Sequence, residues 1–303
     1  MRSSLAALMF AAGLGTSPAL AHDAYVFGAK FHDMTVDGRA RRIYVNMPDA
    51  VFTGDKMPLI VALHGTGSSP EGMVTAANLY RLSETAGAVV VAPQALGAAF
   101  NDGSGRGGPA AEGVDDVRFI EAAIEEVREH AKIDAQRIYL VGFSSGASMA
   151  QRFLADSAYP VAAVAAPADG NYAGADTPKR PRPLLLFWGT ADKLNPLGGG
   201  SVTYPQFKVT LQKPALQEVA ARWAGRLGCT TDKLDFDQGV TTRRWTGCAG
   251  NAVVDFHLVD GLGHHWPGGR PTPIPASVIG PYRDDPDLTD MVWKFFDRHR
   301  LAN

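Results

Sequence analysis

The strongest chemical signal in the chain is Gly-Phe-Ser-Ser-Gly at residues 142–146. It follows a strand-like apolar run at 137–141 and precedes a helix-compatible run at 147–153. Small residues let a strand and a helix approach closely at a sharp turn, and such a turn can lift a serine hydroxyl off the strand end. Ser144 is therefore the candidate nucleophile. With 33 glycines in the chain the pattern can also arise by chance, as a turn in which Ser145 caps the helix.

A serine hydroxyl is a weak nucleophile, so it requires an adjacent base that is held in one tautomer by an acid. In one known arrangement the chain order is serine, acid, histidine, with each residue on a loop after a strand. Asp192 follows the apolar run 183–188, and His264 follows the run 253–258. We therefore expect His264 to be the general base and Asp192 to orient it.

Alternatives exist for both residues. Asp192 could be an ordinary turn aspartate. The neighbouring His265 could replace His264 as the base, whereas His257 lies within a strand pattern that favours a core or surface role. A metal site built from the three histidines would need a carboxylate at suitable spacing, and no metal is expected.

Acyl transfer also requires donors for the negatively charged oxygen of the tetrahedral intermediate. The backbone N–H of Ser145 is one candidate. The second is Thr66 in the segment His-Gly-Thr-Gly at 64–67, which follows another apolar run and matches an H-G-x type of oxyanion loop. A phosphate cradle is excluded, since neither G-K-[ST] nor a third glycine at dinucleotide spacing follows.

These residues need elements that bring them together. The run 59–63, Leu-Ile-Val-Ala-Leu, is typical of a strand buried on both faces, and residues 115–132 show one apolar helical face. Alternating strands and helices predict an α/β protein with a mostly parallel sheet, helices on both faces and a single domain. Strands are expected at residues 42–45, 58–64, 88–92, 137–142, 161–166, 183–188 and 253–258, and helices at residues 115–132, 215–227 and 288–299.

Two stretches, residues 96–113 and 195–213, are rich in glycine or small residues and show no clear periodicity. Long irregular segments in a compact domain are often functional. They are expected either to rim the active site as a lid or to be surface connectors.

The first 21 residues have the pattern of a secretory signal peptide, with Arg2, an apolar stretch and the closing Ala-Leu-Ala at 19–21. A buried N-terminal helix is the alternative. Residues 22–303 are then the mature catalytic domain, secreted or periplasmic, and no stretch is long enough to predict a membrane span. The net charge of -2 and pI near 6.4 come from interspersed charges, so neither nucleic acid nor a membrane surface is an expected partner.

Cys229 and Cys248 are the only two cysteines of the chain. In an exported protein they predict one disulfide, and two free buried thiols are the alternative.

Taken together, these motifs resemble the polyhydroxybutyrate depolymerase-like esterases and the feruloyl and acetylxylan esterases of carbohydrate esterase family 1. The resemblance covers most of residues 22–303. The segments that carry it are 36–42, 58–65, 115–120, 133–139, the turn 189–196, the helix 223–229 and, most specifically, Gly-His at 263–264 with Trp-Pro-Gly-Gly at 266–269.

This resemblance implies an α/β-hydrolase fold, the triad of Ser144, Asp192 and His264, an oxyanion hole at Thr66 and Ser145, and a Cys229–Cys248 disulfide. It selects His264 over His265. The sequence departs from the family pattern in three places that bear on substrate preference: Trp188 where histidine is frequent, His265 where threonine is frequent, and the segment 145–147, Ser-Gly-Ala, where Asn-Gly-Gly is frequent.

The sequence therefore predicts an exported serine carboxylesterase that needs no cofactor. Its expected substrate is a small or oligomeric ester, such as a polyhydroxybutyrate oligomer or a feruloyl or acetyl ester of polysaccharide. One domain leaves no room for a module that binds solid polymer, which favours soluble oligomers. A serine peptidase with the same triad and a catalytically silent binding protein are the alternatives, and the sequence does not indicate the oligomeric state.

Overall fold

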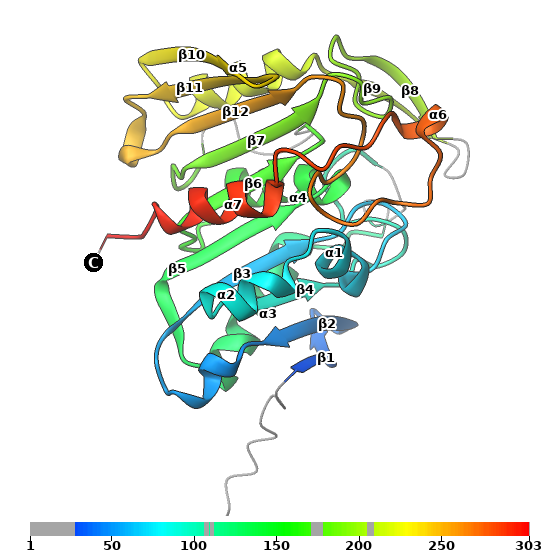
Figure 1. Cartoon of the computed structure of the whole chain (residues 1–303). Helices are drawn as coiled ribbons and strands as arrows, with labels where there is room; N and C mark the ends of the chain where they lie inside the picture. Colours follow the sequence, from blue (N-terminus) through cyan, green and yellow to red (C-terminus); the bar gives the residue numbers. More distant parts are fainter. Residues whose placement is uncertain (1–27, 106–108, 110–111, 171–177, 205–208, 303) are drawn as a thin grey trace, which may run out of the picture.

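The computed structural model describes residues 28–105, 109, 112–170, 178–204 and 209–302 (Figure 1). Within them, ten strands form one sheet in the order β1-β2-β4-β3-β5-β6-β7-β12-β11-β10, and β8 pairs with β9 in a separate hairpin. The strands are β1 Gly28–Val36, β2 Arg39–Met47, β3 Met57–Leu63, β4 Val89–Pro93, β5 Ile133–Gly142, β6 Ala163–Pro167, β7 Leu184–Gly189, β8 Gly200–Tyr204, β9 Val209–Lys213, β10 Thr231–Asp237, β11 Val240–Thr246 and β12 Val254–Val259.

The centre of the sheet is parallel, from β4 through β3, β5, β6 and β7 to β12. Antiparallel strands flank it, β1 and β2 on one side and β11 and β10 on the other. The carboxyl ends of parallel strands meet at one edge of a sheet, which is where α/β proteins place their ligands. The predicted fold class, an α/β-hydrolase fold with a mostly parallel sheet, is confirmed.

Helices cover both faces of the sheet (Figure 1). Helices α3, α4 and α5 pack into one core, and α1, α2 and α7 pack into the other. Strand β3 shows why both cores form: Leu59, Val61 and Leu63 contribute to the first core, and Ile60 and Ala62 to the second. The helices are α1 Pro70–Ala76, α2 Tyr80–Ala86, α3 Asp116–His130, α4 Ser145–Asp156, α5 Leu216–Arg226, α6 Ala276–Ile279 and α7 Leu288–Asp297.

The local signals for helix starts act as expected in α3, where the Asp115 carboxylate accepts the N–H of Arg118 at 2.9 Å. The predicted disulfide is also present, joining Cys229 after α5 to Cys248 after β11. It ties the antiparallel flank of the sheet to the helix that covers it.

The prediction of an irregular segment at residues 195–213 is wrong for much of its length, because β8 and β9 form an antiparallel hairpin there. The start of β8 could not be recognised because residues 198–200 are glycines, which have no side chains to show an alternating pattern. The predicted signal peptide and the mature start at His22 lie outside the described residues. No helix in the described ranges has the length and apolarity needed to cross a bilayer.

Candidate active site

Ser144 occupies a strained turn between β5 and α4. Its φ of 55° and ψ of -125° lie in a region that non-glycine residues rarely adopt. The backbone N–H of Ser144 donates to the Pro167 carbonyl at 3.1 Å, and the N–H of Gly146 donates to the Phe143 carbonyl at 2.9 Å. These bonds hold the serine at the carboxyl end of β5, beside the end of β6.

The glycines on either side of Ser144 are required by close backbone contacts. A Cβ atom on Gly142 would lie 2.1 Å from the Gly146 carbonyl oxygen, and one on Gly146 would lie 2.1 Å from the Leu63 carbonyl oxygen. A Cβ on Gly65, in the loop after β3, would lie 3.2 Å from the Cβ of Ser144. The Gly-x-Ser-x-Gly pattern is therefore a packing requirement between β3, β5 and α4.

Asp192 and His264 form a buried pair. The Nδ1 atom of His264 lies 2.7 Å from Oδ2 of Asp192, and the exposed fractions of the two residues are 7% and 4%. The other carboxylate oxygen of Asp192 accepts the backbone N–H groups of Leu194 and Asn195, each at 2.8 Å. Because Nδ1 donates to the carboxylate, Nε2 of His264 is the nitrogen left to act as a base.

The structure places Ser144 at the same edge of the sheet as this pair. The ring of Phe143, next to the serine, lies 5.0 Å from the His264 ring between centroids. Among the described residues no hydrogen bond joins the Ser144 hydroxyl to the imidazole. Catalytic hydrogen bonds are often long before substrate binds, so the serine–histidine link belongs to the proposal below.

Of the two predicted oxyanion donors, Thr66 lies in the loop after β3 and Ser145 lies at the start of α4. Ser145 is the first residue of α4, so its N–H has no acceptor within the helix. No hydrogen bond among the described residues uses the backbone N–H of either Thr66 or Ser145. The loop after β3 is fixed by bonds on both sides of Thr66, since the Gly65 carbonyl accepts the Ser68 N–H at 3.1 Å and the Gly67 N–H donates to the Ala98 carbonyl at 2.7 Å.

His64 supports this loop without taking part in proton transfer. Its Nε2 accepts the N–H of Ala95 at 3.1 Å, so its Nδ1 carries the proton and donates to the Gly65 carbonyl at 2.9 Å. Burial lowers the pKa of His64, which keeps the ring neutral. With a hydrogen bond at each ring nitrogen, the neutral imidazole fixes the loop after β3 in place.

The other candidate histidines have structural roles. His265 donates through Nε2 to the Gly280 carbonyl at 3.1 Å, and burial lowers its pKa. Burial also lowers the pKa of His257 to about 4, and its ring contacts the Thr242 hydroxyl at 3.0 Å. In the described part of the chain no group of three or more histidine, cysteine and acidic side chains could hold a metal ion.

Asn195 is a supporting residue whose role the sequence analysis missed. Its side-chain amide donates to the Ala168 carbonyl at 2.6 Å and lies 3.5 Å from Nδ1 of His264. The spacing Asp-x-x-Asn was the available signal, because the Asp192 side chain accepts the backbone N–H of Asn195, three residues later. Asn195 therefore joins the acid loop to the end of β6.

A second contact that the sequence did not reveal is the ion pair between Lys213 and Asp169. Their charged atoms lie 2.9 Å apart, and both side chains are almost fully buried. Asp169 lies just beyond β6, and Lys213 ends β9. The pair anchors the β8–β9 hairpin to the edge of the sheet that carries the candidate site.

Residues 60–299 match the model of the alpha/beta hydrolase family. The chain belongs to this family. All three predicted triad residues of this α/β hydrolase lie within the range that the family model matches: Ser144, Asp192 and His264.

Curated relatives of this α/β hydrolase include feruloyl esterase B of Piromyces equi, 30% identical over 235 residues, which cover 74% of this chain and 42% of the relative. The chain thus spans less than half of that protein. Probable feruloyl esterase C of Aspergillus niger is 26% identical over 293 residues, which cover 94% of this chain and 90% of the relative. These relatives confirm the predicted resemblance and the prediction of a carboxylic ester hydrolase.

Among solved structures, the hydrolase is similar to an acetyl xylan esterase from Aspergillus awamori, with a TM-score of 0.60 and 16% identity. The match covers 88% of this chain and 99% of that chain. At this identity the likeness supports the fold alone.

Proposed function

We propose that this protein hydrolyses carboxylic esters through an acyl-serine intermediate on Ser144. The observation that carries the proposal is the buried Asp192–His264 hydrogen bond at the sheet edge where the strained Ser144 turn also lies. A paired, desolvated aspartate stabilises the imidazolium that forms when the histidine takes a proton. Strain at Ser144 is consistent with a preorganised nucleophile.

In the first half-reaction, Nε2 of His264 takes the Ser144 hydroxyl proton as Oγ attacks the ester carbonyl. The tetrahedral oxyanion accepts hydrogen bonds from the N–H groups of Thr66 and Ser145, and the imidazolium then protonates the departing alcohol. In the second half-reaction, His264 deprotonates the water that attacks the acyl-serine. The imidazolium then returns the proton to Oγ of Ser144 as the bond between Oγ and the acyl carbon breaks, which releases the acid and regenerates the serine. The cycle needs neither a metal nor an organic cofactor.

For the substrate we propose feruloyl or acetyl esters of polysaccharide, in soluble or oligomeric form. The support is the set of relatives named feruloyl esterases. Hydroxybutyrate oligomers are the second candidate, because the sequence motifs resemble those of depolymerase-like esterases. The same triad could also cleave amides, so peptides serve as a comparison substrate.

We also propose that the protein is exported, with residues 1–21 removed as a signal peptide. The Cys229–Cys248 disulfide supports this location, because disulfides persist mainly in oxidising compartments. Interspersed charges give no reason to expect nucleic acid or a membrane as a partner.

The proposal is tested by following hydrolysis of p-nitrophenyl acetate by the purified protein and by Ser144→Ala. The variant should lose at least about 10³-fold in kcat, because nucleophile and base act as a unit. Ser201→Ala, at an exposed position on β8, is the matched control and should keep wild-type activity. Retained activity in Ser144→Ala would refute the mechanism. Methyl ferulate, acetylated xylan, hydroxybutyrate oligomers and a peptide then rank the substrates.

A further inference from the structure

Strand β10 is an exposed outer edge of the large sheet. Its sequence is Thr-Asp-Lys-Leu-Asp-Phe-Asp, and all seven residues are exposed, including Leu234 at 66% and Phe236 at 70%. Among the described residues its one neighbour in the sheet is β11, and Figure 1 shows it at the rim opposite β1. An exposed edge with large apolar side chains is a template for pairing with another strand.

The backbone of β10 is oriented for such pairing. The N–H of Phe236 donates to the Asp235 carboxylate at 3.0 Å, so it points away from β11. Because backbone groups alternate between the two sides of an antiparallel strand, Asp232 and Leu234 also direct their N–H and C=O groups outward. These three residues form the outer edge of the strand, which pairs with no other strand among the described residues.

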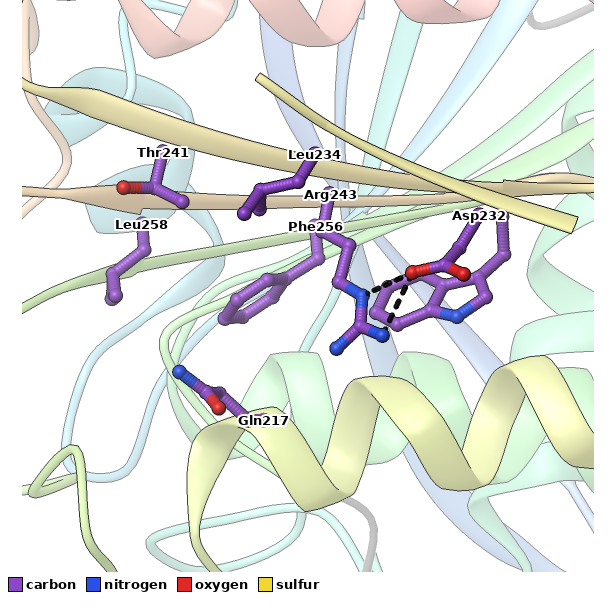
Figure 2. Close-up of a pocket in the computed structure, with 8 residues that line it drawn as sticks. Gln217, Asp232, Leu234, Thr241, Arg243, Phe256 and Leu258 are labelled. Atoms are coloured by element: carbon purple, nitrogen blue, oxygen red, sulfur yellow. Dashed lines mark hydrogen bonds and ion pairs between the residues drawn. The ribbon is translucent and has the colours of Figure 1, made fainter. Parts of the chain in front are cut away.

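Asp232 and Leu234 line a hollow between the sheet and α5. A cavity of about 370 Å³ lies there, with Leu234, Phe256 and Leu258 among its walls and the Arg243–Asp232 ion pair at one side (Figure 2). Strand alternation puts Phe236 on the same face as Leu234. The apolar side chains of the edge therefore continue an apolar surface that α5 covers only in part.

The charges of β10 are complementary to a second copy of the strand. In an antiparallel pair with a two-fold axis through Leu234, Leu234 lies opposite itself and Phe236 opposite Asp232. On the other face of the sheet, Lys233 of each copy lies opposite Asp235 of the second copy. Opposite charges placed directly across two strands are stabilising.

The neighbouring symmetric registers are less favourable. An axis through Lys233 opposes two lysines, and an axis through Asp235 opposes two aspartates. An axis through Phe236 places Asp235 opposite Asp237 twice. Like charges directly opposite are destabilising, so the register centred on Leu234 is the one that these charges select.

We infer that β10 is a self-association surface, through which two copies of this chain pair antiparallel with Leu234 on the two-fold axis. The two ten-stranded sheets then form one continuous sheet across the two-fold axis. Closed two-fold symmetry uses the same strand from each copy, so pairing covers the exposed β10 edge of both copies. In the single chain the Asp235 carboxylate accepts the N–H of Phe236. In the pair this carboxylate binds Lys233 of the second copy instead.

A cross-linking experiment tests the register directly. Both native cysteines are in a disulfide, so Leu234→Cys introduces the one free thiol at an exposed site. Opposed residues of an antiparallel pair have Cα atoms about 5.5 Å apart, within disulfide range, and oxidation should yield a covalent dimer on a non-reducing gel. Phe236→Cys is the matched control, because its two copies would lie about 13 Å apart and should not cross-link.

A charge-exchange experiment tests the pairing energy. Lys233→Asp should raise the dimer dissociation constant, measured by sedimentation velocity, by about tenfold, because it replaces two attractive pairs with two repulsive ones. Adding Asp235→Lys to the same chain should restore the dimer. A wild-type protein that sediments as a monomer at all concentrations, equal cross-linking of the two cysteine variants, or a dimer unaffected by Lys233→Asp would each overturn the inference.

Discussion

The carboxylate of Asp192 and the imidazole of His264 meet at 2.7 Å, although 72 residues separate them in the chain. Each follows a parallel strand of the central sheet, and β7 and β12 are neighbours with Gly189 paired to Val259. The turn after β7 and the loop after β12 therefore begin side by side. The sheet register, rather than local sequence, fixes this contact.

Replacing Asp192 with asparagine should lower kcat by about 10²- to 10⁴-fold with little change in KM. The amide keeps the volume but no longer holds His264 as the Nδ1–H tautomer or stabilises its charged form. Steady-state kinetics on a soluble ester, with circular dichroism to verify folding, measure the effect. A kcat within about twofold of wild type would show that another acid orients the histidine.

Gly146→Ala should destabilise the fold by about 1–3 kcal/mol and reduce activity, because the new methyl group would meet the Leu63 carbonyl at 2.1 Å. The clash pushes α4 away from β3 and moves Ser144 relative to Thr66. Urea unfolding gives the free energy of unfolding.

Gly225→Ala is the matched control for that variant. Gly225 lies on the exposed side of α5, and a Cβ there meets nothing within 4 Å. Alanine should stabilise the helix by about 0.5–1 kcal/mol. If both variants lower the free energy of unfolding equally, close packing at the Ser144 turn is not the cause.

Removing the disulfide by the double variant Cys229→Ala/Cys248→Ala should lower the free energy of unfolding by about 3 kcal/mol. The bond closes a loop between residues 19 apart in sequence and ties α5 to β11. Dithiothreitol should reduce the stability of the wild type to that of the variant. Unchanged stability of the wild type after complete reduction would contradict this prediction.

His257 should make the fold sensitive to acid. Burial lowers its pKa to about 4 in the folded protein, whereas the unfolded chain has the ordinary value near 6.5. As the pH falls from about 6.5 to about 4, the unfolded state binds the proton first, so about 3 kcal/mol of stability is lost over that range. His257→Gln should lose less between these pH values in urea unfolding. Equal losses in the two proteins would exclude His257 as the cause.

The elements that carry the candidate site were predictable because their residues are governed by local rules. The apolar run of β3 predicts a strand buried on both faces, and the flanking glycines predict the tight turn at Ser144. The β10–β11 hairpin was not predicted, since the exposed β10 carries four charged residues out of seven and has no core periodicity. Helix α1 was also missed, although Ser69 caps it and Pro70 opens it.

Contacts between distant residues were harder to foresee. The bond from Asn195 to the Ala168 carbonyl depends on how β6 and β7 end, and no pattern in the sequence specifies it. The buried pair of Lys213 and Asp169 arises from the same cause. Local sequence thus predicted the chemical groups, and the sheet topology determined what supports them.

The identity of the nucleophile is tested most directly by mapping a covalent adduct. The purified protein is treated with a fluorophosphonate, digested, and the modified peptide is sequenced by mass spectrometry. We expect one adduct per chain, on Ser144, with loss of ester hydrolysis in proportion to labelling. An adduct on Ser145 or on another residue, or full inactivation without any adduct on Ser144, would contradict the proposed mechanism.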